Sequence, residues 1–136
     1  MKTEHQLRLI LEKREIPSEI AEPLLARFVE AQLIDDLQYA KSFVSSRLAA
    51  GGKSAALLRR ELKQKGVSPD LVDLALADLD QEQEFALALR LVQSRYQRMS
   101  KLEPDVIRRR LFGLLLRRGF SGSTASRAIA AAVVSE

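Results

Sequence analysis

Apolar residues follow a helical period along the whole chain, and one apolar spacing occurs three times. The three sets are Leu7, Leu11 and Ile16, then Leu58, Leu62 and Val67, then Leu111, Leu115 and Phe120, at offsets of 51 and 53 residues. Apolar residues four apart lie on one face of a helix, and repeats of about this length are typical of stacked helical units. The pattern therefore predicts an all-α protein built from tandem three-helix repeats.

Residues 36–80 form the clearest predicted unit, because each of its three helices has a start signal. The caps and breakers are, in chain order, Asp36, Gly51, Gly52, Ser54, Gly66, Ser68 and Pro69. Asp and Ser favour helix N-caps, Pro favours the first helical position, and Gly favours the left-handed residue after a helix. Asp36, Ser54 and Ser68 are thus the expected N-caps.

The flanking units are predicted by analogy with the middle one. Residues 81–136 are expected to form three further helices, the second opened by Pro104 and the third starting at Ser121. Residues 1–35 show only two helical patterns, of which the first begins with a capping-box sequence and matches the second helix of the middle unit. We therefore expect the first helix of this unit to be missing. The other helix is expected to bury Ile20, Leu24, Leu25 and Phe28.

Composition excludes several classes of protein. The chain has 136 residues, of which 46% are hydrophobic and 29% are charged, so it can bury a core in water. It has no signal-peptide pattern near Met1 and no run approaching the roughly eighteen apolar residues of a membrane span. We expect a cytoplasmic protein without membrane contact. The lack of cysteine excludes disulfides, iron–sulfur clusters and thiolate zinc sites.

Few side chains suit catalysis or metal binding. His5 is the single histidine and has no cysteine or second histidine as a partner, so no metal site is expected. Asp35 and Asp36 stand at a predicted helix start, where carboxylates cap free amides. The segment 51–54 is too short for a phosphate-binding loop. We expect no catalytic residue, no cofactor and no enzymatic activity.

The net charge of +4 is unevenly distributed. Residues 1–35, 36–80 and 81–136 carry −2, +1 and +5. An acidic start and a basic end indicate an oriented contact with a polyanion or an acidic protein surface, the alternative being an arginine-rich solvated surface. The candidate partner-binding cations recur on the second helices of the two later units: Arg59, Arg60, Lys63, Lys65, Arg108, Arg109, Arg110, Arg117 and Arg118.

Some of these cations have a second interpretation, because cations also stabilise helix C-termini. This applies to Lys65 and Arg118, each of which precedes a helix-ending glycine. It does not apply to residues 108–110, which lie near a predicted helix start, and there we favour partner binding. Arg47 and Arg95 each close a first helix, and for these two we favour a structural role.

A wider set of residues has the order and spacing of a known family. In the middle unit these are Asp36, Tyr39–Ala40, Phe43–Val44, Arg47, Gly52, Leu58 and Glu61–Val67. Near the C-terminus they are Arg110–Leu111, Leu115 and Arg117–Phe120, and between units Leu33–Asp36. Together they resemble the middle repeat, the last repeat and the inter-repeat link of RecX, the bacterial regulator of the RecA recombinase. The resemblance covers nearly the whole chain.

This resemblance implies an elongated, curved array of three-helix repeats that binds the RecA nucleoprotein filament. It implies that the chain mostly inhibits the recombinase, ATPase and coprotease activities of RecA and has no catalytic residue of its own. We expect a monomer whose partner is the RecA filament, with single- or double-stranded DNA as a further candidate partner. Two other hypotheses stay open: a helical-repeat nucleic-acid-binding module that acts without RecA, and a small metal-independent enzyme.

Overall fold

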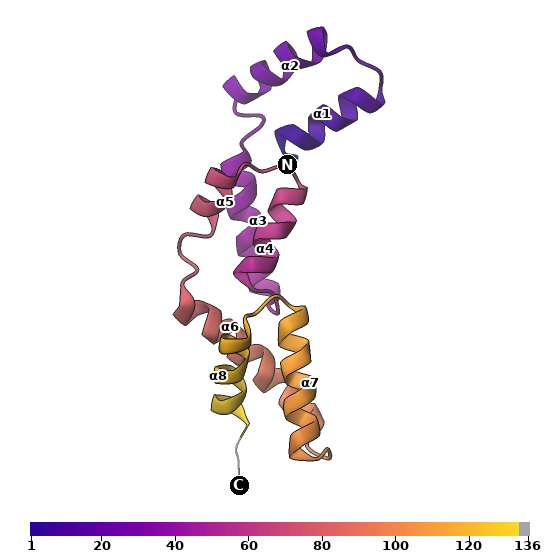
Figure 1. The fold of residues 1–136 in the computed structure, drawn as a ribbon. Coiled ribbons are helices and arrows are strands. Elements are labelled where there is room, and N and C mark those ends of the chain that lie inside the picture. Colours follow the sequence, from indigo (N-terminus) through magenta and orange to yellow (C-terminus); the bar gives the residue numbers. More distant parts are fainter. Residues whose placement is uncertain (134–136) are drawn as a thin grey trace. The chain divides into compact units, whose positions relative to one another are not determined.

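The computed structural model describes residues 1–133, and the regular structure in that range is helical (Figure 1). The elements are α1 (Glu4–Lys13), α2 (Ser18–Glu30), α3 (Asp36–Ala50), α4 (Ala55–Gln64), α5 (Pro69–Ala75), α6 (Gln81–Tyr96), the short 3-10 helix η1 (Gln97–Met99), α7 (Pro104–Arg117) and α8 (Gly122–Ala132). Residues 1–133 contain no strand, so the all-α prediction is confirmed. No helix in this range has the length and apolar character needed to cross a membrane.

Most helices begin where the sequence predicts, because polar side chains satisfy the free amides of the first turn. Thr3 and Gln6 form the expected capping box at α1. Ser54 caps α4 through a hydrogen bond that its Oγ accepts from the Leu57 amide at 3.1 Å. Pro104 occupies the first turn of α7, where its missing N–H costs nothing.

Two predicted caps differ in the structure. The prediction that Asp36 caps α3 is wrong. The Gln38 amide donates a hydrogen bond to Asp35 Oδ1 at 3.0 Å, so Asp35 is the N-cap. Asp36 lies one residue further on, and its Oδ1 accepts a hydrogen bond from the Glu4 amide at 3.0 Å. Ser68 precedes α5 as predicted, but its hydroxyl makes no capping hydrogen bond.

The chain divides into two compact units. The first unit comprises residues 1–46 and 59–77, and the second comprises residues 47–58 and 78–136. The division crosses α3 and α4, so each of these two helices contributes residues to both units.

The core of the first unit is formed by apolar side chains that the helical pattern places inward. Its buried apolar residues are Ala21, Leu25, Ile34, Ala40, Val44, Leu62, Val67, Val72 and Leu76. Ile20 was predicted to be buried, and this prediction is wrong, because its side chain is 60% exposed. Within the unit α2 packs against α1 and buries Ala21 and Leu25, whereas Leu24 and Phe28 are half-buried.

The core of the second unit lies among α6, α7 and α8. In Figure 1, α8 runs beside α6, and both α6 and α7 contact it. The buried residues of this core are Leu87, Ala88, Val92, Ile107, Leu111, Leu115, Phe120, Ala125, Ala128, Ile129 and Val133. Leu111, Leu115 and Phe120 are the third predicted apolar set, and all three are buried as expected.

Within the first unit, the start of α1 lies against the end of α4. We call this contact the first joint. Thr3 is fully buried, and its Oγ1 donates a hydrogen bond to the Lys65 carbonyl at 2.6 Å. Gly66 follows with φ +84°, and a Cβ at this position would lie 2.1 Å from the Cβ of His5. Glycine is needed here both for the left-handed backbone and for the close approach of α1.

Candidate anion-binding surface

The second unit contains an equivalent joint, and this second joint positions the candidate site. The start of α4 lies against the end of α7, where the Ser54 amide donates to the Arg118 carbonyl at 3.2 Å. Ser54 is 1% exposed, as buried as Thr3 in the first joint. Gly119 has φ +91°, and a Cβ there would lie 2.4 Å from Ser54 Oγ.

An acidic side chain completes each joint by accepting a hydrogen bond from the first amide of a helix. In the second joint the Ala55 amide donates to a carboxylate oxygen of Glu84, as the Glu4 amide donates to Asp36 in the first. Burial raises the pKa of Glu84, and the hydrogen bond from Ala55 partly offsets this effect. Burial likewise raises the pKa of Asp36, and the hydrogen bond from Glu4 opposes the rise.

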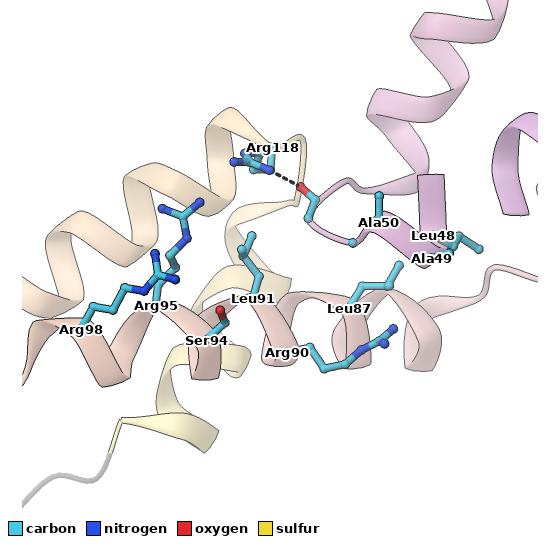
Figure 2. A pocket seen from close by; sticks show the side chains of 12 residues that line it. Leu48, Ala49, Ala50, Leu87, Arg90, Leu91, Ser94, Arg95, Arg98 and Arg118 are labelled. Carbon is cyan, nitrogen blue, oxygen red and sulfur yellow. Dashed lines mark hydrogen bonds between the residues drawn. The ribbon is translucent and has the colours of Figure 1, made fainter. Parts of the chain in front are cut away.

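Beside the second joint is a hollow of about 400 Å³ that we call the arginine pocket. Arg90 and Arg95 of α6 and Arg98 of η1 line it together with Arg118, which follows α7. Figure 2 shows Arg95 of α6 and Arg98 of η1 close together, and Arg118 hydrogen-bonded to the glycine loop after α3. No aspartate or glutamate is among the described residues that line the pocket. The hollow is within the size range of ligand-binding clefts.

The three arginines come from two consecutive elements. Arg90 and Arg95 lie on α6, on which Leu87, Ala88 and Val92 are buried, and Arg98 lies on η1, which directly follows α6. All three line the same pocket.

Arg118 is held in place by its backbone and its side chain. Its carbonyl accepts from Ser54, and its Nη1 donates a hydrogen bond to the Gly52 carbonyl at 3.2 Å (Figure 2). Gly52 has φ +81°, and a Cβ there would lie 2.6 Å from Arg118 Nη1. The absence of a side chain at residue 52 therefore allows the guanidinium group to reach the backbone.

A second hollow lies between α6 and α7 and continues the basic surface. Its charged residues are Arg95, Arg109, Arg110 and Arg117, of which Arg95 also lines the arginine pocket. Gly113 lines this hollow as well, and a Cβ there would be 3.2 Å from Arg117 Nη1. We call the joined set the arginine track: Arg90, Arg95, Arg98, Arg109, Arg110, Arg117 and Arg118.

A third hollow, between α7 and α8, has a different chemistry. Arg108 and Arg109 border it, whereas much of the remaining lining is apolar and includes Phe112 and Ile129. Phe112 is 36% exposed, so an aromatic ring is available at this surface. Apolar and aromatic groups bordered by arginine are typical of protein-binding surfaces.

The predicted cations of residues 36–80 have surroundings unlike those of the arginine track. Arg59 forms an ion pair with Asp73 of α5, and Lys65 Nζ lies 5.5 Å from the centroid of the Phe43 ring. Arg60 and Lys63 are exposed. The structure thus brings Arg109, Arg110, Arg117 and Arg118 into one surface, whereas Arg59, Arg60, Lys63 and Lys65 belong to the other compact unit.

The sequence analysis missed three residues of the track. Arg90 and Arg98 were not singled out, and Arg95 was assigned a structural role. Their closeness in the sequence is a signal that was available, but their proximity to Arg118 depends on the packing of α7. No ion pair of these three arginines is found within residues 1–133.

The described residues do not form a metal-binding cluster, since no three histidine or acidic side chains within residues 1–133 converge. The chemistry that this surface offers comes from its arginines, because several guanidinium groups that line one hollow can bind an anion together. Guanidinium groups stay charged at any physiological pH and can donate paired hydrogen bonds to phosphate or carboxylate.

Sequence comparison relates the middle and C-terminal predicted repeats to one family. Residues 35–76 match the second three-helix domain of RecX, and residues 81–129 match the third. A regulatory protein RecX from Streptomyces coelicolor is 42% identical over 135 residues, which cover 99% of this chain and 72% of the relative. The chain belongs to the RecX family. The resemblance and the three-helix organisation predicted from sequence are confirmed.

Further RecX proteins support this assignment. The regulatory protein RecX of Thermobifida fusca is 40% identical over 128 residues, covering 94% of this chain and 69% of the relative. A crystal structure of regulatory protein RecX superposes with a TM-score of 0.81 at 29% identity, over 94% of this chain and 63% of that chain. RecX from Lactobacillus salivarius has the same fold, with a TM-score of 0.84 at 19% identity over 95% of this chain and 84% of that chain.

Proposed function

We propose that this RecX protein is a cytoplasmic, non-catalytic regulator that binds the RecA nucleoprotein filament and mostly inhibits its recombinase, ATPase and coprotease activities. In this role it acts in DNA recombination, repair and the SOS response. The observation that carries the proposal is the arginine track, which lies on the unit that contains the third RecX domain. A nucleoprotein filament offers both phosphate and protein surface to such a track.

The two kinds of hollow suit the two components of a nucleoprotein filament. The arginine pocket offers charge without aromatic anchors, whereas the hollow beside Phe112 offers apolar contact bordered by Arg108 and Arg109. Several basic side chains on one side also favour oriented encounter with a highly acidic partner. We assign the predicted cations of the first unit, Arg60 and Lys63 above all, to secondary contacts.

The deciding experiment measures ATP hydrolysis by a preformed RecA filament on single-stranded DNA. Adding an excess of this protein should lower phosphate release, and the protein alone should release none. Unchanged release would contradict the proposal. A pull-down of RecA with and without DNA and ATP separates this function from the alternative, a nucleic-acid-binding module that acts without RecA. Retention of DNA without RecA would favour the alternative.

A triple variant tests the assignment of residues 108–110. Changing Arg108, Arg109 and Arg110 to Ala should weaken binding to the filament and leave the melting midpoint nearly unchanged. The control variant is Arg14→Ala, which removes an exposed cation of the first unit. A lower melting midpoint with intact binding would mean that the three arginines are structural.

A further inference from the structure

We propose that the arginine pocket is a phosphodiester-binding site that holds the backbone of a polynucleotide without reading its sequence. Arg90, Arg95 and Arg98 supply the mobile cations of the site, and Arg118 supplies a fixed one. The inference rests on the proposed function in one respect, since a nucleoprotein filament would bring the polynucleotide to the pocket. Binding itself requires no RecA.

The pocket concentrates positive charge that the fold does not neutralise. Four guanidinium groups line it, no carboxylate does so among the described residues, and Arg90, Arg95 and Arg98 have no ion pair within residues 1–133. Like charges at short range repel one another, so an unoccupied cluster is unfavourable for the folded chain. An oxyanion ligand removes this repulsion.

Helix capping does not explain the cluster. Arg95 is in the last turn of α6, where a cation interacts favourably with the helix dipole. Arg90 lies in the interior of the same helix, far from that end, and gains nothing from the dipole. Arg118 is already bonded to the Gly52 carbonyl, and its remaining N–H groups face the pocket that the other three arginines line.

The pocket is partly organised before any ligand binds. The Arg118 carbonyl accepts a hydrogen bond from Ser54 in the second joint, its Nη1 donates to the Gly52 carbonyl, and a Cβ at residue 52 would displace this guanidinium group. A guanidinium group already held in place loses less side-chain entropy on binding than a free one. Planar guanidinium groups also match the paired oxygens of a phosphodiester.

The lining of the pocket favours a polynucleotide backbone over an acidic protein segment. It has no aromatic residue on which a base could stack, and its leucines are buried (Leu87) or half-buried (Leu48 and Leu91). Phe112, an aromatic side chain suited to a protein partner, lies at the separate hollow between α7 and α8. Contacts to phosphates without base contacts bind any sequence alike.

The arginine track gives the proposed strand a continuous path. Arg95 belongs to both the arginine pocket and the hollow that Arg109, Arg110 and Arg117 border. A polynucleotide carries one negative charge per nucleotide, so successive phosphates can meet successive arginines. A single small anion would use only one part of this path.

The test uses the purified full chain without RecA and a fluorescently labelled single-stranded oligonucleotide. Anisotropy titrations at several KCl concentrations give the affinity and its salt dependence for two unrelated sequences. We expect both sequences to bind alike, and affinity to fall with salt. The variant Arg90→Ala/Arg95→Ala/Arg98→Ala should bind at least tenfold more weakly. Its slope of log affinity against log salt should flatten by about 0.7 for each lost contact.

A matched control separates the pocket from net charge. The variant Lys13→Ala/Arg14→Ala/Arg27→Ala removes three exposed cations from the first unit and should retain most of the affinity. Equal losses in the two triple variants would overturn the proposal, because charge alone would then explain binding. Replacing the three pocket arginines by Lys keeps the charge and should restore only part of the affinity. Circular dichroism melts must show that none of the three variants has a lowered midpoint.

Two further outcomes separate this inference from its rivals. If a labelled polyglutamate peptide of equal charge binds the pocket as tightly as the oligonucleotide, the site recognises acidic protein and the proposal is wrong. The RecA ATPase assay is then run with the pocket variant. Normal oligonucleotide binding with lost inhibition would overturn the pocket assignment and leave the proposed function intact. Lost oligonucleotide binding with full inhibition would support the pocket and place filament regulation elsewhere.

Discussion

In the first compact unit, Arg8 bonds to Glu4 and Glu22, and Arg59 bonds to Asp73. In the second unit, Arg90, Arg95 and Arg98 line one pocket whose described lining residues include no carboxylate. The charges follow the same division. The first unit contains 10 basic and 11 acidic residues, a net charge of −1. The second contains 12 basic and 7 acidic residues, a net charge of +5.

The difference shows that the same side chain serves two purposes in one repeated fold. The joints of the two units are alike, with a buried Thr3 or Ser54, a left-handed glycine and an acidic partner for a helix amide. Architecture therefore does not require an unpaired arginine. Arg90, Arg95 and Arg98 are available for a ligand because no acidic residue within residues 1–133 forms an ion pair with them.

The largest expected effect tests whether the two cores are alike. Leu62 of the first unit and Leu115 of the second are both fully buried. Changing either to Ala should lower the free energy of unfolding by roughly 2–5 kcal/mol, because each leaves a cavity. Leu74→Ala is the control, because Leu74 is 58% exposed and its replacement should change the free energy of unfolding little. Urea denaturation measures all three, and a harmless Leu62→Ala would show that the predicted inner face is wrong.

The next effect tests the second joint. Gly119→Ala introduces left-handed strain and places a Cβ 2.4 Å from Ser54 Oγ and 3.3 Å from the Leu57 amide nitrogen. Gly51→Ala introduces the same strain with no atom within 4 Å. We expect Gly51→Ala to lower the free energy of unfolding by about 1 kcal/mol, and Gly119→Ala to lower it by roughly 1–3 kcal/mol more. Equal melting midpoints would mean that the joint accommodates a side chain.

A smaller expected effect compares Ser54, whose hydroxyl caps a helix, with Ser68, whose hydroxyl does not. Ser54 caps α4 and is buried in the second joint, so Ser54→Ala should cost about 1 kcal/mol or somewhat more. Ser68 makes no capping hydrogen bond, so Ser68→Ala should change the free energy of unfolding by less than about 0.5 kcal/mol. Thermal melts of the two variants compare them. A larger loss at Ser68 would reverse the assignment.

The comparison of arginines can be tested by stability alone. Arg8→Ala removes bonds to two carboxylates and should cost up to about 1 kcal/mol, because the pair is largely at the surface. Arg98→Ala removes no ion pair and should leave the melting midpoint unchanged or slightly raised. Loss of stability at Arg98 equal to that at Arg8 would show that the arginines of the second unit are structural too.

The smallest effect concerns pH. Burial raises the pKa of Glu84 in the folded chain above its value in the unfolded chain. The folded state therefore binds the proton of the Glu84 carboxyl more tightly than the unfolded state does. The stabilisation from this proton is full at pH values below the pKa of Glu84 in the unfolded chain, and it is lost as pH rises through the pKa of Glu84 in the folded chain. Relative to Glu84→Gln, the unmodified chain should lose stability as pH rises across that interval. A difference that does not vary with pH would contradict the burial of this carboxyl.

Much of the fold could be predicted from sequence, because caps and apolar periods act locally. Ser54, Pro104 and the left-handed Gly66 stand where their propensities place them. The errors occurred where a tertiary contact outweighs a local preference. Asp36 bonds to Glu4 of another helix instead of capping its own, and Ile20 stays exposed because α2 is covered on one narrow side.

The candidate site could be predicted only in part. The C-terminal excess of arginine and the runs at 108–110 and 117–118 are visible in the sequence. Arg90 and Arg98 are separated from Arg118 by at least twenty residues, and nothing in their local sequence relates them. The structure relates them by packing α7 beside α6, so that Arg118 reaches both the pocket and the Gly52 carbonyl.

The sequence by itself determined the helices, the repeated apolar faces, the family and the sign of the charge on each part of the chain. These properties depend on residue type and on spacing within one or two helical turns. Helical spacing already pairs Arg8 with Glu4, but the tertiary structure alone decided which arginines meet in the pocket and that Glu22 and Asp73 pair with Arg8 and Arg59. Whether a guanidinium group finds a carboxylate depends on which helix packs beside it, and residues far apart in the chain supply the partner, as Asp73 does for Arg59.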